Sequence, residues 1–430
     1  MNCKVVFVIP HIPDYDDMAD MPRPDINWDT PDGNWVGIWG LDWGNQIGDN
    51  ILKYFPELEF EVWQPDLRAD KVYSHTFESG VVQRLIPASI LNGEVVSEPM
   101  MRELEKAIAV RPRGLVIQVD GRRSALSENL LGRFSDQAPI LNQYLGSLSN
   151  VWPNYDFRVW RWLQRYFRAK RFLKYILEKQ KYLAILDLIP RGPAFEKIAA
   201  SPDKKIFRHF MGMTEDFFSE GHDKAAIRKK WNIPVGNTVF LSASRLNRLK
   251  QIVQIVNAFG KVREEACTLL ICGAGSDDFK DQMNSAIEKQ HNDVRFLGFL
   301  TGERLTDVYK LSDVFIDASL DDGAPFSAWQ AMGTGLGVIT TATGNAGGFL
   351  KKHQAGVYIP RKKVGQWTPV FEAVASGKMQ IKRVPIQAVR DTIGWAVCAE
   401  RKVAIYRAML EDFHGALSRD ASRQGNSKVV

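Results

Sequence analysis

Short apolar runs alternate with amphipathic segments along most of the chain. In the first half, such runs predict β-strands at 3–10, 58–65, 113–121, 138–144 and 182–190. In the second half, they predict strands at 237–244, 267–275, 293–300, 313–319 and 355–360, with helices at 251–263, 278–290 and 303–312. Because the strand runs are apolar without strict alternation, they are typical of parallel sheets covered on both faces. The pattern predicts two doubly wound α/β domains that bind ligands in a cleft at the carboxyl ends of their strands.

Length and composition agree with this division. A chain of 430 residues suits two domains of ordinary size. No apolar run approaches the roughly 18–20 residues that span a bilayer, and the N-terminal run at 3–10 suits a first strand rather than a signal segment. We therefore expect a cytoplasmic protein, soluble or peripheral at the inner face of the cell membrane. The four cysteines lack metal-type spacing and suit reduced, structural thiols: Cys3, Cys267, Cys272 and Cys398.

The positive charge of the chain is concentrated in one segment. Residues 158–181 contain nine Lys or Arg and one acidic residue, Glu178, which gives +8. The net charge of the chain is +6, so the remainder sums to 6 − 8 = −2. Apolar residues recur there at spacings near three and four, which predicts an amphipathic helix with a cationic face. Such a helix suits an anionic membrane surface. A solvated surface helix is the alternative, and no nucleic-acid motif supports a nucleic-acid partner.

Residues 11–48 interrupt the alternation of strands and helices. They contain eight Asp and four Trp, and a connection of this length inside a compact domain is usually functional. The flat faces of Trp28, Trp35, Trp39 and Trp43 and the acceptor oxygens of the Asp residues suit the binding of sugar rings. The alternative is that the tryptophans only fix an irregular loop on the core.

Two cations follow the first strand of the second half. Arg245 and Lys250 lie in "SASRLNRLKQIV" (242–253), on or beside the loop that leads into a helix. Backbone N–H groups and the helix dipole favour anions at such a position. The pair therefore predicts a diphosphate site, although an Arg and a Lys in a loop also occur as solvated surface residues.

From this turn onward the chain resembles the donor-binding half of retaining glycosyltransferases of family 4, which have the GT-B fold. Ser244, Arg245, Leu246 and Lys250 match the "GRL…KG" turn of that family, with Ser244 in place of its first glycine. The resemblance continues through "ICGAGS" (271–276), which contains Gly273, through "MGMTEDFF" (211–218), and to a terminal helix at 395–410.

The resemblance implies four parts of the chain. These are an acceptor-side Rossmann-like domain at 1–212, a donor domain at 213–390, a helix at 391–415 that packs back on the first domain, and a flexible tail at 416–430.

The segment "DDGAPFSAWQAMGTGLGVITT" (321–341) reads as a loop, a helix, a glycine break and a buried strand. Members of the family carry a Glu-x7-Glu signature here, whereas this chain has Asp322 and Gln330 with seven residues between them. The resemblance implies that Gln330 contacts the nucleotide ribose without charge assistance, and that Asp322 lies against the transferred sugar with a shorter reach. Gly323 and the free amides of Phe326 and Ser327 would face the phosphates.

The resemblance also implies a mechanism. Transfer would proceed on the front face of the sugar, and Arg245 and Lys250 would neutralise the departing diphosphate without a metal or a cofactor. In the first half, Gly40 would face the diphosphate as the survivor of a double-glycine loop. His11 and Asp120 follow or end strands and are expected to face the cleft, although an ordinary loop role is the alternative for His11.

The expected function is transfer of a hexosyl group from a nucleotide-diphosphate sugar to a glycan or lipid-linked acceptor in surface polysaccharide synthesis. Two alternatives remain. One is a GT-B sugar-nucleotide epimerase or hydrolase. The other is a catalytically impaired relative that binds a nucleotide sugar or serves as a scaffold, because both signature glutamates are replaced.

Overall fold

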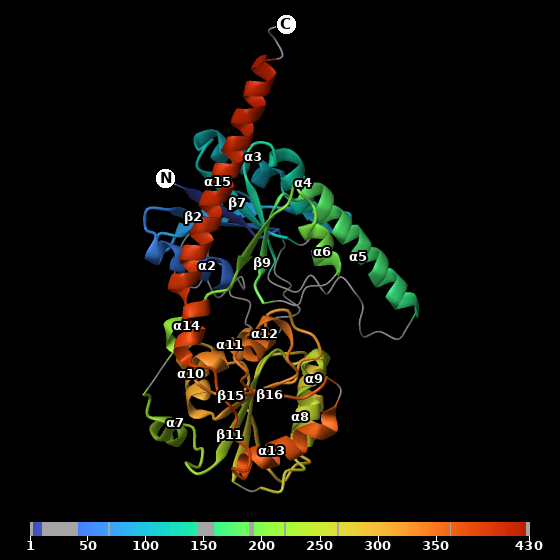
Figure 1. Cartoon of the computed structure of the whole chain (residues 1–430), viewed down its shortest axis with the longest axis vertical. Helices are drawn as coiled ribbons and strands as arrows, with labels where there is room; N and C mark the ends of the chain where they lie inside the picture. The colour runs from blue at the N-terminus through green and yellow to red at the C-terminus, as the bar shows by residue number, and fades with distance from the viewer. Residues whose placement is uncertain are drawn as a thin grey trace.

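The computed structural model describes residues 3–10, 42–67, 69–121, 123–144, 159–188, 193–218, 221–264, 266–361 and 363–426. These residues form two α/β domains, each built around one large and mostly parallel sheet (Figure 1). The doubly wound α/β class predicted from the apolar runs is therefore confirmed.

The N-terminal domain contains an eight-stranded sheet in the order β10-β9-β8-β7-β1-β2-β4-β3. Every neighbouring pair is parallel except β3 and β4. The strands are β1 (Lys4–Val8), β2 (Glu59–Asp66), β3 (Tyr73–Thr76), β4 (Val82–Pro87), β7 (Leu115–Asp120), β8 (Ile140–Tyr144), β9 (Tyr182–Leu186) and β10 (Lys205–His209). The helices are α2 (Asp42–Tyr54), α3 (Glu98–Val110), α4 (Ala125–Phe134), α5 (Val159–Lys179) and α6 (Pro193–Ala199).

The five predicted strands of this half are present as β1, β2, β7, β8 and β9. The strands β3, β4 and β10 were not predicted, and neither was the hairpin of β5 (Ser89–Leu91) and β6 (Glu94–Val96). The three sheet strands lie towards the ends of the sheet, and the hairpin lies outside it. Polar side chains interrupt the apolar pattern in all of them, because such strands are less completely covered.

The C-terminal domain contains a six-stranded, all-parallel sheet in the order β13-β12-β11-β14-β15-β16. The strands are β11 (Thr238–Ala243), β12 (Cys267–Cys272), β13 (Asp293–Phe296), β14 (Val314–Asp317), β15 (Gly337–Thr340) and β16 (Val357–Tyr358). The helices are α7 (Lys224–Lys230), α8 (Ile252–Phe259), α9 (Asp277–Ile287), α10 (Gly302–Leu311), α11 (Phe326–Gly333), α12 (Gly344–Lys352) and α13 (Trp367–Ala375). The strand order reverses direction between β11 and β14, so this is the point where such a sheet is expected to bind its ligand.

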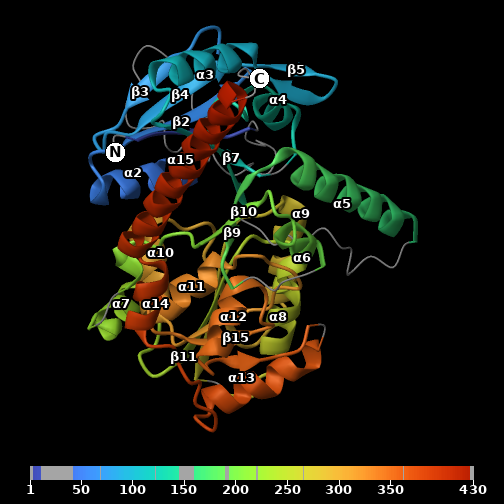
Figure 2. The ribbon, with the colours of Figure 1, turned by 45° about the horizontal axis from the view of Figure 1, so that its top comes forward.

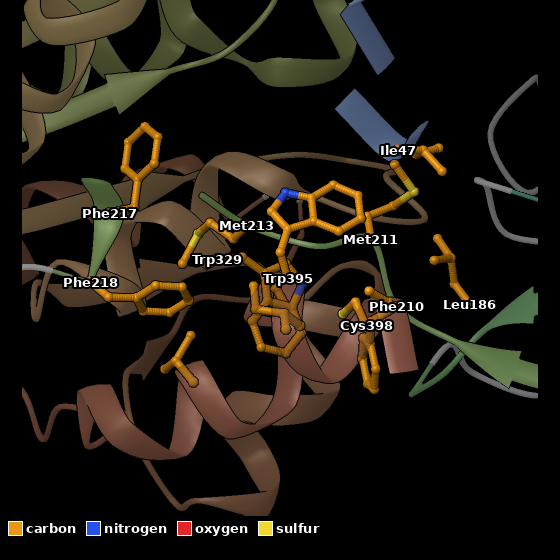
Figure 3. Packing of buried hydrophobic residues seen from close by; sticks show 14 of the residues in the cluster. Ile47, Leu186, Phe210, Met211, Met213, Phe217, Phe218, Trp329, Trp395 and Cys398 are labelled. Carbon is orange, nitrogen blue, oxygen red and sulfur yellow. The ribbon is translucent and has the colours of Figure 1, made fainter. Parts of the chain in front are cut away.

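One apolar core joins the two domains. The chain crosses between them at Phe210–Phe218, where Met211 and Met213 pack with Trp395 and Trp329 (Figure 3). A Cβ on Gly212 would lie 2.1 Å from the Trp395 ring, so the crossing admits no side chain there. The carboxyl edges of the two sheets meet in the same region, because the carbonyl of Leu188, just after β9, packs against Gly348 on α12.

The end of the chain returns to the N-terminal domain. After α14 (Ile386–Ile393), the long helix α15 (Trp395–Asn426) crosses from the C-terminal domain and packs along α2, β7 and β10 (Figures 1 and 2). Asp412 on α15 accepts a hydrogen bond from the Tyr182 hydroxyl at 2.9 Å and pairs with Lys181 at 2.9 Å. The returning helix is as predicted, but it continues past residue 415 to Asn426, because no proline or other strong helix breaker occurs there. No helix within the described residues is long and apolar enough to cross a membrane.

Candidate functional site

Two loops meet at the carboxyl ends of β11 and β14, where the strand order reverses. The loop after β11 carries Arg245 and Lys250, and the loop after β14 leads into α11. The amide of Leu320 donates to the carbonyl of Leu249 at 2.8 Å, and the side-chain amide of Gln251 donates to the carbonyl of Ala318 at 2.6 Å. These bonds fix the two loops to each other, so that residues distant in the sequence form one site.

Lys250 is the centre of this site. Its ammonium forms an ion pair with Asp322 and donates to the Ser319 hydroxyl at 3.1 Å. The side chain of Lys250 is 11% exposed and that of Asp322 is 22% exposed, so the pair is only partly shielded from water. The second oxygen of Asp322 accepts the amide of Ala324 at 3.0 Å, which fixes the carboxylate. The sequence assigned these two residues to different groups of the ligand, whereas the structure joins them directly.

Asp321, which precedes Asp322, has a shifted pKa. Burial raises the pKa of the Asp321 carboxyl above its ordinary value; Arg361 opposes this effect, and the charge of Asp322 adds to it. Arg245 is exposed and forms no ion pair with a described residue. It is therefore available to a ligand from solvent.

Gly273 holds the turn after β12 against the Arg245 loop. It has φ +149°, and a Cβ there would lie 1.8 Å from the Ser244 carbonyl oxygen. The amide of Leu246 donates to the Ala274 carbonyl at 2.7 Å across the same contact. Gly273 is thus required for the close approach of two loops, a structural role at the site.

Helix α11 begins at the same edge of the sheet. Phe326 and Ser327 occupy its first turn, where amide groups have no carbonyl of their own helix to bind. Gly323 precedes the helix, is buried, and accepts the amide of Asn345 at 3.2 Å. The Trp329 indole donates to the Asn345 side chain at 2.9 Å, which anchors the helix from its buried face. The N-terminal turn of α11 is thereby held next to Asp322.

Gln330 lies one turn further along α11 and contacts a residue that was not predicted. Its side-chain oxygen accepts a hydrogen bond from the Tyr309 hydroxyl at 3.1 Å. Tyr309 is fully buried on α10, and burial raises the pKa of its phenol well above the ordinary value. The oxygen of Gln330 is therefore engaged within the protein, and the amide N–H₂ forms no hydrogen bond with a described residue.

Asp317 is a second residue that sequence reasoning missed. It ends β14, is buried, and accepts hydrogen bonds from the Ser319 hydroxyl at 2.5 Å and the Thr340 hydroxyl at 3.1 Å. It thus orients Ser319, which in turn binds Lys250. An aspartate at the carboxyl end of a predicted apolar strand was the available signal.

Of the site residues predicted in the N-terminal half, the structure describes only some. Asp120 ends β7 at the carboxyl edge of the N-terminal sheet, as expected. His11, Gly40 and the tryptophans at 28, 35 and 39 lie outside the described residues, so their roles stay predictions. Among the described residues, no three His, Cys, Asp or Glu side chains are grouped to hold a metal ion.

Two Rossmann-like domains and a C-terminal helix that returns to the first of them define the GT-B fold class. Residues 223–382 match the family described as glycosyl transferases group 1. The resemblance stated for the donor half is confirmed.

Individual relatives agree with this assignment. A D-inositol 3-phosphate glycosyltransferase of Nocardia farcinica is 24% identical over 205 residues, covering 45% of this chain and 46% of that protein. The chain thus spans about half the length of the curated relatives it matches. A glycosyltransferase structure from Rickettsia africae superposes with a TM-score of 0.63 at 14% identity, over 95% of this chain and 99% of that one. An Anabaena protein in complex with UDP-glucose superposes with a TM-score of 0.56 at 14% identity, over 97% and 99%. Both likenesses concern the fold.

Proposed function

We propose that this protein is a glycosyltransferase that moves a sugar from a nucleotide-diphosphate sugar to a glycan or lipid-linked acceptor. The observation that carries the proposal is the cluster of Lys250, Asp322 and Ser319 beside the first turn of α11. A lysine, an exposed arginine and the N-terminal end of a helix suit a diphosphate that gains charge as it leaves. The fold likeness to an Anabaena protein that binds UDP-glucose supports a donor of this class.

In this proposal Lys250 acts on the departing diphosphate and Asp322 on the sugar. The diphosphate competes with Asp322 for the Lys250 ammonium, so donor binding releases the carboxylate towards the sugar. Transfer with retention and without a metal, in surface polysaccharide synthesis, is the form of the reaction that the family resemblance suggests.

The alternative is a nucleotide-sugar-binding protein without transferase activity. Two contacts favour it: Asp322 is engaged by Lys250, and the oxygen of Gln330 is engaged by Tyr309. Both residues stand where the family carries glutamates, and neither presents a free carboxylate to a ligand.

Thermal unfolding with a panel of UDP-, GDP-, ADP-, CMP- and dTDP-sugars tests donor binding. At about 100 times the dissociation constant, a ligand adds roughly 2.7 kcal/mol, or several degrees in Tm. The Lys250→Ala variant should lose the shift, while Lys378→Ala, an exposed lysine of the same domain, should keep it. No shift with any donor would refute the proposed donor site.

Nucleotide release with and without glycan acceptors then separates the two candidates. Release that depends on an acceptor supports transfer, whereas binding without release supports the alternative. If the glutamine reflects loss of activity, Gln330→Glu should strengthen binding and restore turnover. If Gln330 is adapted to this donor, the same change should leave turnover unchanged or reduce it.

A further inference from the structure

Helix α5 presents a cationic outer face. Five described cations of α5 are exposed: Arg168, Lys170, Arg171, Lys174 and Lys179. Phe167 lies beside them and is 56% exposed, which is unusual for a phenylalanine. An apolar ring among cations on an exposed helix is the arrangement expected of a helix that binds a charged and partly apolar surface.

The opposite face of α5 is occupied. Ala169, Phe172, Leu173 and Ile176 pack into small apolar clusters with the sheet and α6. Helix α5 is therefore already attached to its own domain, and the cationic face points away from it.

Few of these cations have an acidic partner among the described residues. Lys174 pairs with Glu178 at 3.6 Å, a surface contact of small energy. Arg168, Lys170 and Arg171 form no ion pair with any described residue. Lys174 lies four and three residues after Lys170 and Arg171 on the same face, so these like charges repel each other, and a negatively charged counter-surface would relieve that cost.

Helix α5 extends beyond the sheet of its domain. The helix connects β8 to β9, which are parallel neighbours, so it runs opposite to them and begins at the carboxyl edge of the sheet. Its 21 residues span about 31 Å, whereas a strand of five residues spans about 17 Å. The N-terminal part of α5 therefore projects past the edge that faces the C-terminal domain (Figures 1 and 2).

We propose that α5 docks the protein on an anionic membrane surface through Lys170, Arg171 and Lys174, with Phe167 inserted among the lipid headgroups. Anionic lipids supply the negative charge, and the headgroup region accepts an aromatic ring. Double-stranded nucleic acid is a weaker fit, because a helix enters the major groove only when it is free on most sides, and α5 is fixed along its inner face. Docking in this way places the carboxyl edge of the N-terminal sheet next to the membrane, independently of what the donor site binds.

Co-sedimentation of the full chain with vesicles tests the proposal. Vesicles of phosphatidylcholine alone are compared with vesicles containing 30% phosphatidylglycerol, at about 50 and 500 mM salt. Binding should require the anionic lipid and weaken at high salt. Each exposed cation near such a surface contributes about fivefold to partitioning, so K170Q/R171Q/K174Q should bind about a hundredfold more weakly.

The matched control is K229Q/K289Q/K378Q, which removes three exposed lysines of the C-terminal domain. It should bind vesicles like the unmodified protein, and Phe167→Ser should weaken binding at both salt concentrations. Equal vesicle binding by the two triple variants would overturn the proposal. So would α5-dependent binding of a polynucleotide without vesicle binding, or α5-dependent dimerisation that hides the face. The nucleotide-sugar thermal shift should be the same in both triple variants, so failure of docking is distinguishable from failure of the donor site.

Discussion

Lys402 offers a direct test of how α15 is held on the N-terminal domain. It is 2% exposed, and its amine donates to the side-chain oxygen of Gln143 on β8. Burial lowers the pKa of this amine from 10.5 to about 7. His209 and Cys398 lie near it, and neither is a carboxylate that would compensate an ammonium charge. We predict that Lys402→Met raises the free energy of unfolding at neutral pH.

The magnitude follows from proton linkage. The unfolded chain binds a proton at this lysine below pH 10.5, whereas the folded chain binds it only below about pH 7, so the stability of the folded protein falls as the pH falls between these values. The resulting cost is roughly 4 kcal/mol at pH 7, about 3 kcal/mol at pH 8.5 and about 1 kcal/mol at pH 10. Methionine has a similar volume and does not titrate. Gln143 keeps a hydrogen bond from Gln118 at 2.8 Å, so the lost bond costs about 1 kcal/mol.

The variant should therefore gain about 3 kcal/mol at pH 7 and nothing at pH 10. Urea unfolding at pH 7, 8.5 and 10, followed by tryptophan fluorescence, measures the difference between the variant and the unmodified protein. Lys378→Met, at an exposed position, is the control and should show no such pH dependence. A difference that is the same at all three pH values would refute the reasoning, because only a titrating lysine makes it change.

Three further predictions concern the packing around the site and the sheets. Gly273→Ala should abolish nucleotide-sugar stabilisation in the thermal assay while the chain still folds, because the added Cβ would lie 1.8 Å from the Ser244 carbonyl oxygen. Arg228→Met should lower the free energy of unfolding by about 3 kcal/mol in urea, because the buried Arg228 guanidinium binds Asp313 at 2.6 Å and donates to the carbonyls of Leu311 and Val235, and all three acceptors lose a donor; an unchanged midpoint would contradict this. His209→Gln should lower the pH of acid unfolding seen by circular dichroism, because burial lowers the pKa of His209 to about 3 and stability is lost as pH falls from 6.5 towards that value. An identical acid midpoint would mean that His209 is not held neutral in the folded protein.

The central strands of the fold could be predicted from the sequence, whereas strands towards the ends of the N-terminal sheet could not. In the C-terminal domain, the apolar runs at 237–244 and 267–275 became β11 and β12, because central parallel strands are buried on both faces and must be apolar throughout. The strand β3 was missed, because its alternately half-buried and exposed side chains at the end of the sheet resemble a polar loop.

Part of the candidate site could likewise be predicted from the sequence, and part could not. Arg245 and Lys250 could be named from their loop, and Asp322 from its spacing to Gln330. The pairing of Lys250 with Asp322 and of Gln330 with Tyr309 could not be predicted, because these contacts depend on how two loops and two helices pack, which no local pattern specifies.

By itself, the sequence determined two α/β domains, the resemblance of the second domain to a glycosyltransferase family, and the concentration of charge in 158–181. These features depend on residue type and spacing along the chain, and both can be read in one dimension. Only the tertiary structure decided that Lys250 pairs with Asp322, that Tyr309 takes the oxygen of Gln330, and that α5 extends beyond its sheet. Each of these depends on the strand order, which brings together segments distant in sequence and sets which polar groups satisfy one another.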